Sequence, residues 1–210
     1  MASSLPDLSA PPAMTLWKRF HWAFFVNTQG LTMALLRFER FFHEGDLEGA
    51  RRELVSAATL MRASGASMQL AGSFSRQAYQ EDVRPSMMPP AMETAGFSGL
   101  MSWDHSSLIE LWRRLGPVFS AMPETLDAEY RDFVAAYGTL AQSHTAVCAR
   151  FVQKGEGSIR YESDEAVESL RRFRKGREAM LDPSGHAAGC PVHDTPPARG
   201  AAAADDEPER

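Results

Sequence analysis

The stretch from Thr15 to about His43 has the pattern of one long amphipathic helix. Its apolar residues recur at three-, four- and seven-residue steps, which places them on one helix face: Leu16, Phe20, Phe24, Leu31, Leu35, Phe38 and Phe42. No stretch of the chain shows the sustained two-residue alternation that is typical of a strand. The sequence therefore predicts an all-α fold, a bundle of about five helices.

A second helix is expected directly after the first. In Glu44-Gly45-Asp46 the glycine suits a helix C-cap and the aspartate suits an N-cap, so the chain should stop and restart there. The next helix is predicted from Leu47 to about Tyr79, packed on the first as an antiparallel hairpin. Three more helices are predicted, at Asp104–Leu115, Asp127–Val152 and Asp164–Leu181.

Prolines and charges set the limits of these later helices. Pro117 and Pro123 are expected to break the chain after the third helix. Pro85, Pro89 and Pro90 exclude a regular helix between the second and third. The methionines and phenylalanine of that segment argue against disorder and favour a functional loop.

The basic face of the last helix is interpreted as solvated surface: Arg171, Arg172, Arg174, Lys175 and Arg177.

Size and composition exclude several classes of protein. A chain of 210 residues is expected to form one compact domain, over 14–193, with disordered ends at 1–13 and 194–210. The net charge of -5 is spread out, which disfavours nucleic-acid binding. No apolar run is long enough to cross a bilayer, and no signal pattern is found, so a cytoplasmic protein is expected. Cys148 and Cys190 make no disulfide framework.

Three separated blocks resemble the tryptophan 2,3-dioxygenase superfamily, the haem-dependent aromatic oxygenases. Phe20-His21-Trp22 stands where these enzymes place a distal-pocket histidine. Val83-Arg84-Pro85 followed by Gly96-Phe97-Ser98-Gly99 resembles their arginine and the loop after it. His144 followed by Gly155-Glu156-Gly157-Ser158 resembles their proximal histidine and its glycine loop. The order of the blocks implies haem between the first helix, the Arg84–Gly99 loop and the fourth helix.

A fourth feature is similar to one branch of that superfamily, which hydroxylates 3-methyltyrosine with peroxide. His144 is followed after 41 residues by His186-Ala187-Ala188-Gly189-Cys190. The motif of that branch implies two histidine ligands to the iron, His144 and His186, and one thioether through Cys190. The chain departs from the superfamily in its glycine loop, which is Gly-Glu-Gly-Ser here, and in its short length.

The residue types suit these roles, although each has a simpler alternative. Imidazole is a usual axial ligand of haem, but His144 could be an ordinary core histidine. His186 and Cys190 share a face if helical, but they could be incidental residues of a glycine-rich tail. With His193 they could also form a metal site, which is one ligand short of a structural zinc site.

Further roles follow from the resemblance. We expect His186 to leave the iron when peroxide binds, because glycines flank it. Arg84 is predicted to clamp a substrate carboxylate, or else to tie down its loop. His21 is predicted to be a distal acid or base, and Phe97 and Ser98 to line the pocket. His105 and His43 stand near helix ends and are assigned no role.

The predicted function is a haem-dependent oxygenase that hydroxylates a small aromatic substrate with peroxide, such as an aromatic amino acid or a derivative. Two alternatives keep the haem: a ring-cleaving enzyme that uses dioxygen, and a non-catalytic bis-histidine haem binder or sensor. A third is a haem-free helical bundle. Self-association into a homo-oligomer is expected from the resemblance, with the first helix and its leader at the interface.

Overall fold

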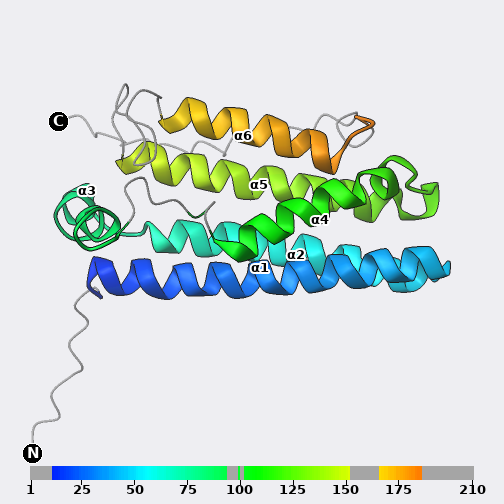
Figure 1. The fold of residues 1–210 in the computed structure, drawn as a ribbon, viewed down its shortest axis with the longest axis horizontal. Coiled ribbons are helices and arrows are strands. Elements are labelled where there is room, and N and C mark those ends of the chain that lie inside the picture. Colours follow the sequence, from blue (N-terminus) through cyan, green and yellow to red (C-terminus); the bar gives the residue numbers. More distant parts are fainter. Residues whose placement is uncertain (1–10, 94–98, 100–101, 152–165, 186–210) are drawn as a thin grey trace, which may run out of the picture.

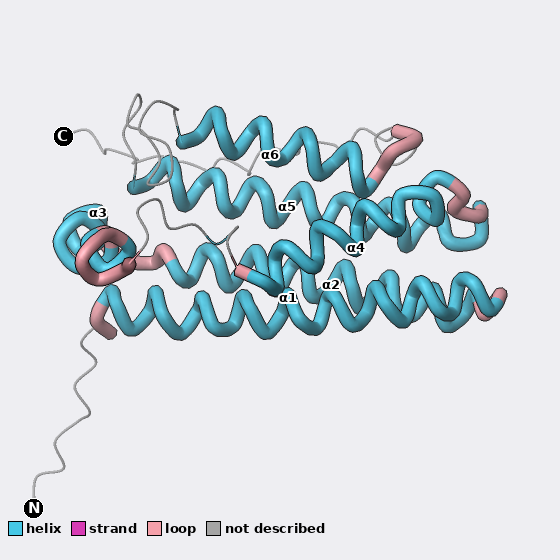
Figure 2. Tube along the Cα trace, in the orientation of Figure 1, coloured by secondary structure: helices cyan, strands magenta, loops and turns pink. Residues whose placement is uncertain are grey.

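The computed structural model describes residues 11–93, 99, 102–151 and 166–185. Within these ranges every regular element is a helix and no strand occurs, which confirms the all-α prediction (Figures 1 and 2). The α-helices are α1 (Ala13–Glu44), α2 (Leu47–Ala71), α3 (Arg76–Ala78), α4 (Trp103–Ser120), α5 (Asp127–Phe151) and α6 (Ala166–Leu181). Short helical turns join them: the π-helix η1 (Tyr79–Val83) and the 3-10 helices η2 (Pro85–Met87) and η4 (Glu124–Leu126).

The long helices form a layered bundle. α1 and α2 make the predicted antiparallel hairpin, α5 packs on α2, and α6 lies on the other side of α5 (Figure 1). α4 crosses obliquely and contacts both α1 and α6. The main core between these helices is built from aliphatic and aromatic side chains, of which the largest fully buried ones are Phe38, Met61, Phe119, Tyr130 and Phe133.

The hairpin turn forms as the sequence predicts. Gly45 closes α1 in the left-handed conformation, with φ of 75°, which a residue with a Cβ adopts only under strain. Asp46 then caps α2, because its Oδ1 accepts a hydrogen bond from the Gly49 amide at 2.8 Å.

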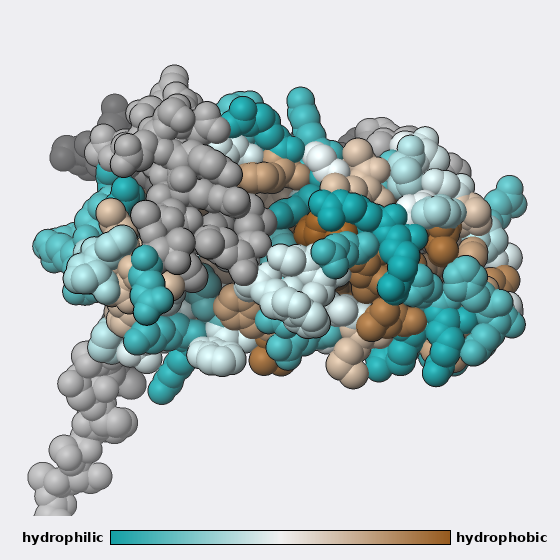
Figure 3. All heavy atoms as spheres, viewed as in Figure 1, coloured by the Kyte–Doolittle hydropathy of each residue, from teal (hydrophilic) through white to brown (hydrophobic). Residues whose placement is uncertain are grey.

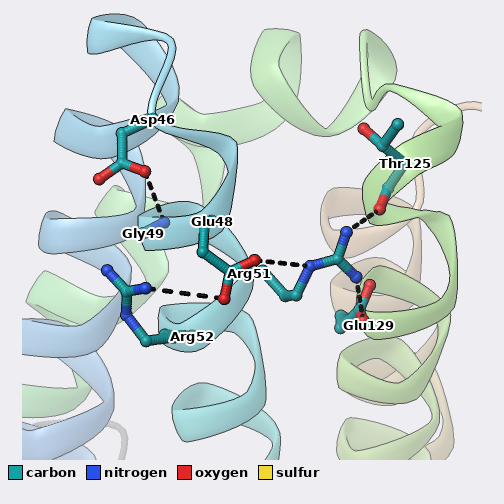
Figure 4. A network of polar contacts seen from close by, with 7 residues as sticks. All are labelled: Asp46, Glu48, Gly49, Arg51, Arg52, Thr125 and Glu129. Carbon is teal, nitrogen blue, oxygen red and sulfur yellow. Dashed lines mark hydrogen bonds and ion pairs between the residues drawn. The ribbon is translucent and has the colours of Figure 1, made fainter.

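A polar network beside this turn joins the hairpin to the second half of the chain (Figure 4). Arg51 on α2 donates to the carbonyl oxygen of Thr125 at 2.6 Å and forms an ion pair with Glu129 on α5. Glu48 contacts Arg51 and Arg52 at 3.4 and 3.6 Å. One guanidinium thereby fixes the start of α5 against α2.

A second, smaller core lies at the opposite end of the bundle. Ala13, Tyr79, Val83 and Phe151 are buried together there, so the cluster joins the start of α1, the η1 segment and the end of α5. The aromatic rings of Tyr79 and Phe151 stack with their centroids 4.6 Å apart. This cluster holds the irregular segment that contains the predicted Arg84 loop.

Two of the predicted helix limits are wrong. The second helix ends at Ala71 rather than near Tyr79, and the chain then turns into α3 and η1. Gly72 caps α2 where the side chain of Val147 on α5 comes so close that a Cβ would stand 2.7 Å from it. Pro117 lies inside α4, which continues to Ser120. Because Pro117 is exposed, water can satisfy the carbonyl that loses its helical partner. The predicted limits Val152 and Asp164 lie outside the described residues.

The outer face of α1 carries an exposed apolar stripe: Trp22, Val26, Met33 and Leu36. These residues lie opposite the buried face of the same helix, which includes Leu31, Leu35 and Phe38. Within the described ranges, no helix is both long and apolar enough to cross a membrane.

Candidate functional site

His144 lies on α5, one helical turn before Cys148. Burial, the positive charge of Arg177 and the charge of His21, in that order, lower the pKa of His144 to about 4. The ring is therefore neutral at pH 7. Neutral imidazole is the form that binds a metal, so the protonation state of His144 fits the ligand role that the sequence predicts.

His21 on α1 comes close enough to His144 for its charge to affect the pKa of that ring. Nδ1 of His21 lies 2.7 Å from the carbonyl oxygen of Trp17, one turn earlier on α1. A carbonyl oxygen only accepts, so Nδ1 carries the hydrogen and Nε2 keeps a lone pair. Burial lowers the pKa of His21, partly offset by the bond to Trp17. Trp17 also packs beside the ring, with centroids 4.3 Å apart.

Two basic residues that received no role from the sequence join this pair. His105, in the first turn of α4, has its pKa lowered to about 4 by burial, then by Arg177 and His144. Arg177 on α6 thus acts electrostatically on both rings. The prediction that the basic face of α6 is solvated surface is wrong for Arg177, which is half-buried.

Tyr137 holds the guanidinium of Arg177. It lies on α5 two turns before His144, and Arg177 donates a hydrogen bond to its hydroxyl oxygen. Burial raises the pKa of Tyr137, while Arg177 lowers it, so the phenol is neutral at pH 7. The Arg177 guanidinium also lies over the ring of Phe173, 5.8 Å from its centroid.

The electrostatics of the group come from one cation beside neutral rings. Among the described residues, no carboxylate belongs to the groups that shift the pKa values of His21, His105 and His144. The site thus combines three half-buried neutral imidazoles with the half-buried guanidinium of Arg177, a combination that suits a ligand with a negative group.

A cavity of about 420 Å³ opens beside this group between α4 and α6. His105 and Arg177 form part of its lining, together with apolar side chains from both helices, including Ile109, Phe173 and Met180. Figure 3 shows hydrophobic and hydrophilic side chains mixed over the face where these two helices meet. The volume lies in the range of pockets that bind small molecules.

A sequence signal could have identified His105 and Arg177 as site candidates. His105 stands in the register of Leu108, Trp112 and Leu115, which are buried on α4. Arg177 stands likewise in the register of Leu170, Phe173 and Met180 on α6, at three- and four-residue steps. A basic residue in the apolar stripe of a helix is costly to bury, and this position marks both as candidates for function.

Arg84 lies at the junction of η1 and η2. Its amide donates to the carbonyl oxygen of Tyr79 at 2.7 Å, and its side chain is half-buried. The neighbouring Val83 packs in one cluster with Val147 on α5. The predicted loop therefore approaches the turn of α5 that follows His144. The other predicted site residues, Phe97, Ser98, His186 and Cys190, lie outside the described residues, as does His193.

Cys148 lies on α5, one turn after His144. Burial raises the pKa of its thiol to about 11. Among the described residues it is a free cysteine, and no group of three or more histidine, cysteine or acidic residues could hold a metal ion there.

The residues present fit haem as a ligand. Imidazole is a usual ligand of haem iron, and the structure supplies one at His144 that is neutral at pH 7 and half-buried on a long helix. The positive charge of Arg177 suits the anionic propionates of a porphyrin or the carboxylate of a substrate.

Comparisons with known proteins identify the family that the chain resembles. Residues 3–129 match the family described as SfmD 3-methyl-L-tyrosine peroxygenase, a range that includes His21, Arg84 and His105. A 3-methyl-L-tyrosine peroxygenase of Streptomyces lavendulae is 32% identical over 179 residues, which cover 80% of this chain and 47% of the relative. The chain thus spans about half the length of that relative. No solved structure matches the chain.

Proposed function

Because the chain belongs to the SfmD 3-methyl-L-tyrosine peroxygenase family, we propose that it hydroxylates an aromatic amino acid, or a derivative of one, with hydrogen peroxide. One oxygen atom of the peroxide would enter a ring C–H bond to give a phenol, and the other would leave as water. The observation that carries the proposal is the group of neutral imidazoles at His21, His105 and His144 beside a cavity of small-molecule size.

We propose haem as the cofactor. When bound, it would supply the redox chemistry by which peroxide oxidises an aromatic ring. His144 and His186 would hold its iron, and Cys190 would tether it through one thioether. Of the two histidines, His186 would be the labile one, because His144 is fixed on a long helix.

His21 would move the proton. Its Nε2 keeps a lone pair because Nδ1 is committed to the Trp17 carbonyl oxygen. That nitrogen can accept a proton from peroxide or from a substrate phenol and return it to the departing water. The lowered pKa of His21 keeps the ring in its basic form at neutral pH.

The remaining predicted residues would form the rest of the pocket. Phe97 and Ser98 are proposed to line it, and the Arg84 loop approaches α5 through Val83. Arg84 and Arg177 are the two candidates for the guanidinium that binds the substrate carboxylate.

Self-association is also proposed, through the outer face of α1. Trp22 is 72% exposed, and it lies on one exposed stripe of α1 with Val26, Met33 and Leu36. Apolar residues at such spacing pair well with a second helix. Size-exclusion chromatography with light scattering should report an oligomer, and Trp22→Ser with Met33→Ser should shift it to a smaller species.

The test of the function is direct. The protein, expressed with ample haem supply, should show a Soret band, and a pyridine haemochrome after acid–acetone treatment should show haem still attached to the chain. His144→Ala should lose haem, whereas Cys190→Ala should release it into the acetone. With peroxide, 3-methyl-L-tyrosine should gain one oxygen atom in mass spectrometry.

Other outcomes separate the alternatives. Gain of two oxygen atoms from dioxygen would indicate ring cleavage. Haem that is bound but consumes peroxide without an oxygenated product, over a panel of tyrosine, tryptophan and histidine derivatives, would indicate a binding or sensing protein. A colourless protein would overturn the proposal.

A further inference from the structure

The cavity between α4 and α6 combines a held cation with apolar walls. Arg177 contributes the cation, and Ile109, Phe173 and Met180 contribute apolar surface. Arg113 and Arg172 add positive charge to the lining, against the single negative charge of Glu110 among these lining residues. The lining is thus basic overall, which favours a ligand that carries a negative group and an apolar body.

Arg177 is positioned before any ligand arrives. Its guanidinium donates to the Tyr137 hydroxyl and lies over the Phe173 ring, so two neighbours restrain a side chain that is otherwise flexible. In the described part of the chain, Arg177 forms no ion pair with an acidic residue; the acid next to it, Glu178, is taken by Arg174 at 2.6 Å. A restrained guanidinium with spare donors is suited to binding a carboxylate through two hydrogen bonds.

Two residues of the cavity lining, His105 and Arg177, lie near the predicted haem ligand His144. The positive charge of Arg177 lowers the pKa of both His105 and His144, and His144 lowers the pKa of His105. A molecule held by Arg177 would therefore lie beside His105 and near His144. In this arrangement the carboxylate of the ligand would bind Arg177, and the body of the ligand would pack against the apolar walls.

We infer that this cavity binds the substrate, and that Arg177, rather than Arg84, binds the α-carboxylate of an aromatic amino acid, with Tyr137 as the residue that positions the guanidinium. The inference rests on the proposed function for the nature of the substrate. Glu110, on the same lining, supplies a negative charge suited to the α-ammonium group. His105 lines the path between the carboxylate site and His144.

The test compares two ligands that differ in the carboxylate alone: 3-methyl-L-tyrosine and 3-methyltyramine. Their dissociation constants are measured by calorimetry on the haem-loaded full chain, for the wild type, Arg177→Met, Arg177→Lys, Arg84→Met and Arg171→Met. Arg171 is the matched control, because it lies on α6 in an exposed ion pair with Glu168 at 3.4 Å and outside the cavity lining.

The wild type should prefer the carboxylate-bearing ligand by about 10- to 100-fold, as expected for a charge-assisted pair of hydrogen bonds. Arg177→Met should abolish this preference, Arg177→Lys should restore part of it, and Arg84→Met and Arg171→Met should keep it. The Soret band should be unchanged in all variants. If Arg177→Met does not fold, the same two dissociation constants are measured for Arg177→Lys and Tyr137→Phe. Each of these variants should show a smaller preference for the carboxylate-bearing ligand than the wild type.

Two results would overturn the inference: an undiminished preference in the Arg177 variants, or a preference lost only in Arg84→Met. Binding that follows the expected pattern without an oxygenated product would leave the carboxylate site standing and overturn the proposed function. An oxygenated product together with an undiminished preference in Arg177→Met would overturn the carboxylate site and leave the proposed function standing. A wild type that binds neither ligand would overturn both.

Discussion

The carbonyl oxygen of Trp17 lies 2.7 Å from Nδ1 of His21, and this contact fixes which ring nitrogen of His21 carries the hydrogen. The acceptor is a backbone atom in the second turn of α1, so its position does not depend on the Trp17 side chain. The free lone pair of His21 is consequently on Nε2, which is the atom available to a reacting proton.

His21→Phe should slow turnover of 3-methyl-L-tyrosine by about 10²- to 10⁴-fold, the usual contribution of a general acid or base. Haem content, measured as the pyridine haemochrome, should stay at the wild-type level. Trp17→Phe is the control, because it removes the indole and keeps the backbone carbonyl, and it should change turnover far less. Loss of haem in His21→Phe would instead identify His21 as an iron ligand.

The stability of the protein should fall in acid, and His105 should be one cause. Its pKa is about 4 in the folded chain against 6.5 for the free ring. Below pH 6.5 the unfolded chain therefore binds a proton that the folded chain refuses until about pH 4, so the free energy of unfolding decreases as the pH falls through this window. The loss is at most about 3 kcal/mol for one such ring.

His105→Gln should flatten this dependence. Unfolding by urea at pH 7.0, 6.0 and 5.0 should show a smaller loss of stability for the variant than for the wild type. His144, which has a similar pKa, keeps the remaining slope. His43→Gln, at an exposed position on α1, serves as the control and should leave the slope unchanged. Equal slopes for His105→Gln and the wild type would contradict the assigned burial of His105.

Gly72 should tolerate no side chain. An alanine Cβ there would stand 2.7 Å from Cγ1 of Val147 and 3.2 Å from a ring carbon of Phe151, both on α5. Val147 is β-branched and cannot rotate away freely. Gly72→Ala should lower the free energy of unfolding by about 1–3 kcal/mol, as overpacking does, measured by urea denaturation.

Gly65→Ala is the matched control on the same helix. Its Cβ would stand 3.4 Å from the nearest atoms of α5, which is ordinary contact. Because alanine favours a helix over glycine by up to about 1 kcal/mol, this variant should be as stable as the wild type or more stable. A similar loss in both variants would show that the approach of α2 to α5 is not the cause.

Arg51→Met should destabilise the packing of the α1–α2 hairpin against α5. The variant leaves the Thr125 carbonyl oxygen and Glu129 without their guanidinium, and the Glu129 side chain is only 19% exposed. A loss of about 1–3 kcal/mol is expected, since the hydrogen bonds are charge-assisted. Arg62→Met removes a more exposed ion pair between the same two helices, to Asp132, and should cost less than about 1 kcal/mol. Thermal unfolding of the two variants compares them.

The helical pattern was readable from the sequence because the apolar faces are long and regular. The turn at Gly45 and Asp46 was readable too, since both residues act through local backbone chemistry. The end of α2 was not, because it depends on the close approach of Val147, a residue 75 positions later in the chain. The continuation of α4 through Pro117 likewise depends on which side of that helix faces water.

The candidate site was likewise only partly predictable from the sequence. The residues that the family resemblance pointed to, His21 and His144, do lie near one another. His105 and Arg177 were passed over because a residue near a helix end and a residue in a basic run are ordinarily solvated. Their place in the cavity lining depends on the packing of α4 against α6, which no local pattern encodes.

The half-buried thiol of Cys148 bears on how such an enzyme would survive its own oxidant. Peroxide attacks thiolates, and a cysteine with a pKa of about 11 holds almost none at neutral pH. A residue one turn from the proposed iron ligand is thus protected from sulfenic acid formation by its surroundings. Wild-type protein and Cys148→Ala should then be inactivated by peroxide at the same rate.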